Sequence, residues 1–186
     1  MQTVTKKGMA RRDGLKTADL VLVGMLLAAG AVLRLFTPSV AGITPNFVIV
    51  MYCLAICLLK PRVSEVLGIS LIAAAICQLT SKSAIPYINF ISEPIGALVA
   101  LALVKAPFKL SFKNYSFKPA VVTLLGTLAS GLTYITTMKS ILLFRGAAGG
   151  KAFTALLLVV LTTALANTVI AQLIYYPLKT AVAKKE

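Results

Sequence analysis

Six long apolar runs, separated by short polar and basic segments, constrain this chain more than any other feature. Each run is continuous and rich in Leu, Ala, Ile and Val, whereas membrane β-strands alternate apolar and polar residues. Hydrophobic residues make up 59% of the 186 residues, which exceeds the apolar share of a soluble domain. The sequence therefore predicts an all-α membrane protein with six transmembrane helices. These are expected at residues 18–36, 46–59, 64–80, 90–105, 119–138 and 153–181.

The runs form one predicted transmembrane domain, residues 18–181, between a basic N-terminal tail, residues 1–17, and a short C-terminal tail, residues 182–186. The first run has no clear cleavage site before the second, so we expect a retained helix and not a removed signal peptide. The second run is short for a full membrane span. Part of the loop before it is therefore expected to dip into the protein.

The distribution of basic residues predicts the orientation of the helices. The chain carries 19 Lys and Arg against five Asp and Glu, a net charge of +14. With a cytosolic N-terminus, 14 of the 19 bases would lie on the cytosolic side, in agreement with the positive-inside rule. Both termini are therefore expected in the cytosol. Because the bases cluster between apolar runs, they indicate membrane topology and not a nucleic-acid site.

The basic loop at residues 106–119 alternates lysines with aromatic residues. This alternation is typical of a segment that lies on anionic lipid headgroups, which makes the lipid bilayer its expected partner. Contact with a partner protein is the alternative.

Catalytic and metal-binding motifs are absent from the sequence. There is no His, and Cys53, Cys57 and Cys77 lie in apolar runs without a His or an acid to join them, so buried thiols are expected and no metal site. The glycine-rich segment 145–150 lacks the Gly-Lys-Ser/Thr ending of a phosphate loop, and no nucleophile–base pair stands out. We therefore expect a binding protein without a cofactor, and neither an enzyme nor an ATPase.

The segment Lys82–Glu93 is a polar interruption of the apolar runs and contains Tyr87 and Asn89. Glu93 is the acid deepest in apolar sequence, and an acid placed there in a membrane protein marks a functional site by default. Asn89 and Glu93 are four residues apart, so they share one face if a helix begins just before them. Either side chain could instead cap that helix or satisfy backbone groups.

Further polar residues of the predicted outer half could converge with Glu93 on one pocket. Arg34 and Lys82 are candidate partners for a carboxylate, although snorkelling toward lipid headgroups is the alternative. Gln78 and Asn167 could bind a ligand or join helices to one another. The candidate substrate-binding residues are Arg34, Asn46, Gln78, Lys82, Tyr87, Asn89, Glu93 and Asn167.

A zwitterion such as an amino acid would fit this pattern of charges. Its ammonium could pair with Glu93, and its carboxylate with one of the two bases. Tyr87, Phe90 or Phe47 could then cover an aromatic or apolar body.

The first predicted helix carries a pair of small residues four apart, Gly24 and Ala28, followed by Ala31. Small residues in this arrangement allow another helix to approach closely. That helix could belong to the same bundle, or the pair could form a docking face for a partner subunit.

Three pieces of the chain point to a known family: the small residues of the first helix, Gly24 and Ala28–Ala31, the ITPNF segment at residues 43–47 and the IPYINFISEP segment at residues 85–94. Together with six helices in under 200 residues, they resemble the substrate-binding S-component of energy-coupling factor (ECF) transporters. The ITPNF and IPYIN pieces are also similar to the bacterial tryptophan-type S-components.

This resemblance implies a protein of the plasma membrane of a bacterium. An S-component binds a vitamin or another small nutrient at the outer face, here tryptophan or an amino-acid-like compound as one candidate, and delivers it with a transmembrane scaffold subunit and two ATPase subunits. In that family, alanines four apart on the first helix pack against the scaffold, and the pair here is Gly24 and Ala28. The alternative is a self-sufficient secondary transporter, which would usually show internal repeats. No convincing self-similarity relates residues 18–90 to residues 90–181.

Overall fold

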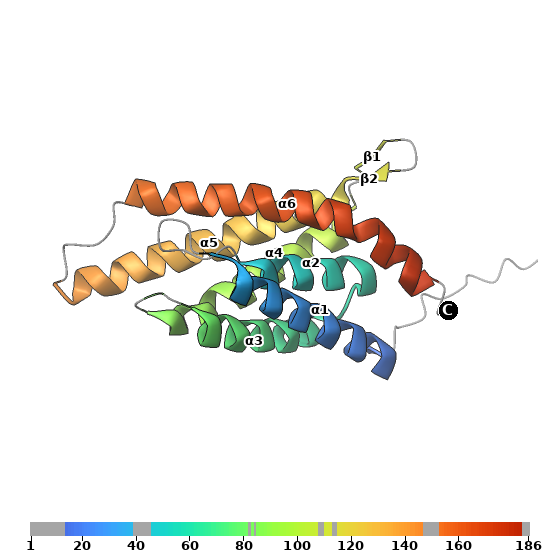
Figure 1. Cartoon of the computed structure of the whole chain (residues 1–186), viewed down its shortest axis with the longest axis horizontal. Coiled ribbons are helices and arrows are strands. Elements are labelled where there is room, and N and C mark those ends of the chain that lie inside the picture. The colour runs from blue at the N-terminus through green and yellow to red at the C-terminus, as the bar shows by residue number, and fades with distance from the viewer. Residues whose placement is uncertain are drawn as a thin grey trace, which may run out of the picture.

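The computed structural model describes residues 14–38, 46–81, 83, 85–107, 110–112, 115–146 and 153–183, so most of the two predicted tails lies outside it. Within these residues, six α-helices lie along one another in an elongated bundle (Figure 1). The helices are α1 (Thr17–Phe36), α2 (Phe47–Leu59), α3 (Val63–Thr80), α4 (Asn89–Lys105), α5 (Lys118–Phe144) and α6 (Phe153–Ala183). The prediction of an all-α membrane protein is confirmed, because five helical segments are long and apolar enough to cross a membrane and α2 is a shorter apolar helix.

Two of the acids cap helices. Asp19 accepts a hydrogen bond from the backbone N–H of Lys16 at the start of α1 (3.0 Å), and Glu65 accepts one from the N–H of Arg62 at the start of α3 (2.6 Å). Acids in the first turn of a helix also complement its dipole. Glu65 additionally accepts a hydrogen bond from the N–H of Leu15 (2.7 Å), which ties the beginning of α1 to α3.

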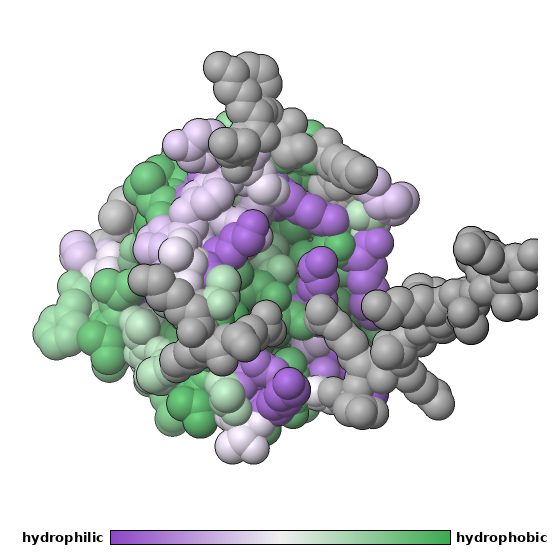
Figure 2. All heavy atoms as spheres, turned by 90° about the vertical axis from the view of Figure 1, so that its right-hand side faces the viewer, coloured by the Kyte–Doolittle hydropathy of each residue, from purple (hydrophilic) through white to green (hydrophobic). Residues whose placement is uncertain are grey.

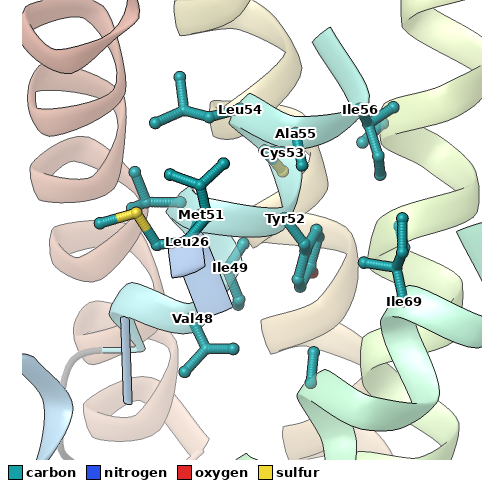
Figure 3. Packing of buried hydrophobic residues seen from close by; sticks show 14 of the residues in the cluster. Leu26, Val48, Ile49, Met51, Tyr52, Cys53, Leu54, Ala55, Ile56 and Ile69 are labelled. Carbon is teal, nitrogen blue, oxygen red and sulfur yellow. The ribbon is translucent and has the colours of Figure 1, made fainter. Parts of the chain in front are cut away.

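The short helix α2 forms the centre of the bundle. It packs against each of the other five helices, and nine successive residues, Val48–Ile56, are buried. Figure 3 shows their side chains extending to several sides of α2, with Leu26 of α1 and Ile69 of α3 close by. Thirteen residues make a helix only about 20 Å long. This length suffices because protein, and not lipid, surrounds α2.

Helices α4 and α5 cross at close range through two glycines, Gly96 and Gly126. A Cβ atom on Gly96 would lie 2.8 Å from the Cβ of Ser130, 2.8 Å from the hydroxyl of Tyr52 and 2.9 Å from the carbonyl oxygen of Gly126. Real Cβ atoms do not approach other atoms this closely, so only glycine fits. The crossing therefore brings hydroxyl groups of α2 and α5 next to α4.

The connections differ from the prediction in two places. The loop expected after residue 138 begins later, because α5 continues to Phe144 and ends where Gly146 adopts a left-handed conformation (φ 67°). The basic loop before α5 contains a short antiparallel hairpin of β1 (Ser111–Phe112) and β2 (Tyr115–Ser116). A 3-10 turn, η1 (Pro86–Ile88), leads into α4.

Basic residues gather at the end of the bundle where α1 begins and α6 ends. Figure 2 faces this end and shows hydrophilic side chains clustered on it, with hydrophobic side chains beside them. The described bases at this end are Lys16, Lys60, Arg62, Lys105, Lys118 and Lys179. The opposite end carries three described bases, namely Arg34, Lys139 and Arg145. The basic residues are thus unequally distributed between the two ends, as in the sequence-based argument for cytosolic termini. The orientation itself stays a prediction.

Candidate functional site

A cavity of about 340 Å³ lies at the end of the bundle opposite the basic end, among α1, α2, α4, α5 and α6. Its volume falls within the range of small-molecule sites. Its polar lining residues are Arg34, Asn46, Ser81, Ser83, Asn89, Ser92, Glu93, Thr127, Ser130, Tyr134, Lys139 and Thr163. The remaining wall is formed by Ile49, Gly131, Ile135, Met138, Leu142, Leu156, Val159 and Val160.

Glu93 is the acid of this cavity, and its carboxylate is held on both oxygens. The Nδ2 of Asn46 donates to Oε1 (2.7 Å), and the hydroxyl of Tyr52 donates to Oε2 (3.1 Å). Glu93 is only 1% exposed. Burial of an acid is costly unless hydrogen bonds compensate it, so these two donors keep the side chain in one position.

Two bases line the cavity, and Arg34 is the buried one, whereas Lys139 is half-buried. Arg34 comes from the last turn of α1 and is 7% exposed, and neither its Nε nor its Nη1 donates a hydrogen bond to any described residue. No described ion pair joins Arg34 to Glu93, although both line the same cavity. A buried guanidinium with unused donors is unfavourable by itself and well suited to an anionic group.

Asn46 connects the cavity to the interior of the bundle. Its Oδ1 accepts a hydrogen bond from the thiol of Cys77 (3.4 Å), and its backbone carbonyl accepts one from the Nδ2 of Asn167 (3.2 Å). The same Nδ2 also donates to the hydroxyl of Thr127 on α5 (3.2 Å). Asn46 thus joins α2, α3, α4 and α6 next to Glu93.

The apolar side of the cavity is a separate small hydrophobic cluster between α5 and α6. Its buried residues are Ile135, Leu156 and Val160, and Met138 packs against them. At the rim, the hydroxyl of Tyr134 donates to the carbonyl of Ile85 (3.1 Å) and ties the segment before η1 to α5. One cavity therefore combines an acid and a base with an extended apolar surface.

The structure brings together only some of the predicted binding residues. Arg34, Asn46, Asn89 and Glu93 line the cavity, and Asn167 lies behind it as a partner of Asn46. Asn89 also donates to the carbonyl of Pro86 (2.6 Å), so it satisfies a backbone group, as one alternative had it, and α4 has no side-chain cap hydrogen bond.

The remaining predicted binding residues either do not line the cavity or lie outside the described residues. Gln78 is half-buried on α3 and Tyr87 is 47% exposed, and neither lines the cavity. Lys82 lies outside the described residues. The expected aromatic cover is also not formed by described residues, because Phe90 is 43% exposed and Phe47 does not line the cavity. The apolar part of the cavity wall consists instead of branched aliphatic side chains and Met138.

Several hydroxyl residues of the site were missed by the sequence analysis. Thr127 and Ser130 are three residues apart on α5, and this spacing was a signal for one polar helix face. Tyr52 gave no comparable signal, because it is a single polar residue in an apolar run. Ser92 lies in the polar segment Lys82–Glu93 but was not singled out there.

The small residues of α1 point away from the bundle. Gly24 and Ala28 are exposed, and a Cβ atom added to Gly24 would have no neighbour within 4 Å. Ala31 is half-buried. Packing of Gly24 and Ala28 inside the bundle, one of the two alternatives, therefore does not occur.

Two comparisons relate the chain to known proteins. A family model described as "Tryptophan transporter TrpP" matches residues 16–183. The chain belongs to this transporter family. It is also 34% identical, over 174 residues, to the "Probable tryptophan transport protein" of Bacillus subtilis (strain 168), covering 92% of this chain and 95% of the relative. No solved structure matches the chain significantly.

Membership in the TrpP family decides the general role of the chain. With its apolar helices, it is a multi-pass membrane protein of the bacterial plasma membrane and takes part in transport, and it is not an enzyme. Among the described residues, no group of His, Cys, Asp or Glu is arranged to hold a metal ion.

Proposed function

We propose that this chain is the tryptophan-binding subunit of an ECF-type importer and that the cavity around Arg34 and Glu93 holds the amino acid. The name of the Bacillus subtilis relative and the description of the family support tryptophan as the substrate. The observation that carries the proposal is the unpartnered guanidinium of Arg34 in a cavity that also contains Glu93.

The two charges suit the two ends of an amino acid. The carboxylate of the substrate accepts hydrogen bonds from Nε and Nη1 of Arg34, which are otherwise unused. Its ammonium donates to Glu93, which the side chains of Asn46 and Tyr52 hold in place. Neither charge is then left unpaired, and water is largely excluded from both.

The rest of the cavity suits a large flat side chain. Ile135, Leu156 and Val160 offer aliphatic surface to one face of an indole ring, and Met138 adds a polarizable thioether. A ring that leaves water for this surface gains roughly 25 cal/mol for each Å² buried. Small polar amino acids would leave most of this wall uncovered.

An importer of the ECF type uses ATP, and this sequence has no phosphate loop of its own, so in the proposed function partner subunits hydrolyse the ATP. We assign the exposed pair Gly24 and Ala28 to docking of a transmembrane scaffold subunit that is coupled to two ATPase subunits. The small side chains leave room for close helix contact in the membrane. The cavity then opens to the outer face, and the basic end shown in Figure 2 lies in the cytosol.

The absence of Trp from the chain permits a direct binding test. Tyrosine is the strongest emitter in this protein, so any tryptophan fluorescence in the sample comes from the ligand. We expect a saturable shift of this emission to shorter wavelength when tryptophan is added to the purified protein, because the ring enters an apolar cavity. A shift that does not saturate would contradict the proposed site.

The partners are tested separately. Affinity-tagged ATPase subunits, expressed with a scaffold subunit, should co-purify this chain, and uptake into vesicles should require all of them and ATP. Uptake of tryptophan by this chain alone in vesicles would instead establish a self-sufficient secondary transporter.

A further inference from the structure

The hydroxyl of Ser92 is the feature of the cavity that the charge pair does not use. Ser92 is fully buried and lines the cavity, and its Oγ has no hydrogen-bond partner among the described residues. Several other helical hydroxyls behave differently, although that of Thr123 also has no partner among the described residues. Thr133, Thr162 and Thr168 each donate to the carbonyl oxygen four residues earlier, at 2.7, 2.9 and 2.7 Å.

Ser92 is next to Glu93 on α4. It lies one helical turn before Gly96, whose position is packed against both Ser130 of α5 and the hydroxyl of Tyr52 of α2. The two oxygens of Glu93 already accept hydrogen bonds from Asn46 and Tyr52. The hydroxyl of Ser92 is therefore left for a ligand in the cavity.

A buried hydroxyl without a hydrogen-bond partner destabilises the protein. A ligand that supplies the partner removes this cost, and its binding free energy becomes more favourable. The indole ring carries one polar group, an N–H that can only donate. Burial of this N–H in an aliphatic cavity would be equally unfavourable without an acceptor. The oxygen of a serine is such an acceptor.

We propose that Ser92 Oγ accepts a hydrogen bond from the ring N–H of the substrate and thereby selects an indole over rings of similar size that lack this donor. The proposal rests on the proposed function, since it places the amino-acid end of the ligand at Arg34 and Glu93. Ser92 is then a specificity-determining residue. A hydrocarbon ring, such as that of phenylalanine, leaves the hydroxyl unpaired and is bound less well.

The test compares tryptophan with β-(3-benzothienyl)alanine, in which sulfur replaces the ring N–H and the shape is nearly unchanged. Calorimetric titration gives the affinity of both ligands for the wild-type protein, for Ser92→Ala and for the control Ser70→Ala. Ser70 is equally buried but lies on α3 outside the cavity wall, and its hydroxyl already donates to the carbonyl of Leu67 (2.9 Å).

We expect the wild-type protein to prefer tryptophan by about tenfold or more, which corresponds to one hydrogen bond between buried groups. Ser92→Ala should weaken tryptophan binding by about tenfold and change the affinity of the sulfur analogue by less than about twofold. Ser70→Ala should leave the preference for tryptophan unchanged.

Equal losses for both ligands in Ser92→Ala would overturn the assignment, because the hydroxyl would then serve the ammonium group or the packing of α4. If the wild-type protein bound the two ligands with equal affinity, the assignment would be overturned by this measurement alone. If the wild-type protein bound neither ligand, the proposed function itself would fail.

Discussion

The two faces of α1 differ in what surrounds their glycines. On the inner face, a Cβ atom on Gly30 would lie 3.0 Å from the Cα of Val48 and 3.0 Å from the Cγ of Met51, so the backbones of α1 and α2 are in direct contact there. On the outer face, Gly24 has no neighbour within 4 Å. Arg34, one turn after Gly30, brings the inner face to the cavity. The same residue type thus serves packing on one face and leaves room for a partner on the other.

Because of this difference, substitutions on the two faces of α1 should affect different properties of the protein. Substitutions on the inner face should affect folding and binding, whereas those on the outer face should affect only the step that needs a partner. The following predictions are ordered by their expected effect on tryptophan binding.

Gly30→Leu should have the largest effect. The added side chain meets backbone atoms of α2, which cannot move without displacing the centre of the bundle. We expect a loss of about 3 kcal/mol or more in stability, together with the loss of binding. Thermal unfolding in detergent measures the stability, and the fluorescence titration measures tryptophan binding. The matched variant Gly24→Leu should unfold at the wild-type temperature, and a similar decrease in both variants would contradict the assignment of the two faces.

Arg34→Gln should preserve the fold and weaken tryptophan binding by roughly 30-fold or more, because the ligand carboxylate loses a buried charge partner. Stability should not fall, since Nε and Nη1 of Arg34 bond to no described residue. Titration with tryptamine, which lacks the carboxylate, provides the control. Tryptamine should bind more weakly than tryptophan, and its affinity should be the same for the wild-type protein and for Arg34→Gln. The exposed base Arg145 allows a second control, Arg145→Gln, with no expected change in affinity.

Glu93→Gln should weaken tryptophan binding by roughly tenfold and should also lower the unfolding temperature. The carboxylate accepts hydrogen bonds from both Asn46 and Tyr52, and the amide of a glutamine would turn an N–H toward one of these donors. Indole-3-propionate, which lacks the ammonium, should bind the variant no worse than the wild type. Unchanged stability with unchanged tryptophan affinity would remove Glu93 from the site.

Gly24→Leu and Ala28→Leu should have the smallest effect on binding, within about twofold of wild type, and yet abolish uptake into cells. Both positions are exposed and Gly24 is without neighbours, so a larger side chain is accommodated in the isolated protein but blocks close approach of another helix. Uptake of labelled tryptophan and co-purification of the scaffold subunit measure the effect. Normal uptake by both variants would place the docking surface elsewhere.

Some parts of the site could be predicted because their signal is local. Glu93 differs from the other described acids in the sequence itself: Asp19 and Glu65 lie in the first turn of their helices, whereas Glu93 has apolar residues of its own run on both sides. The spacing of Asn89 and Glu93 correctly placed both on one helix face and in one cavity. The end of α5 was predicted too early, because Lys139 and Ser140 were taken as the start of a loop and the helix-ending glycine comes at Gly146.

The sequence by itself determined the class of the protein, the number of helices and the asymmetry of charge, because each depends on residues that are close in the chain. Continuous apolar runs require helices in a membrane, whatever their neighbours are. Only the tertiary structure decided which apolar residues face protein and which face outward: α2 is buried at nine successive positions, whereas most of the apolar surface of α6 is exposed, although both are strongly apolar. It also decided that Arg34, Glu93 and Ser92 share one cavity while Tyr87 does not. The physical reason is that lipid and a protein core are equally apolar, so hydropathy does not distinguish them, and the close helix contacts at Gly30 and Gly96 determine which side chains meet.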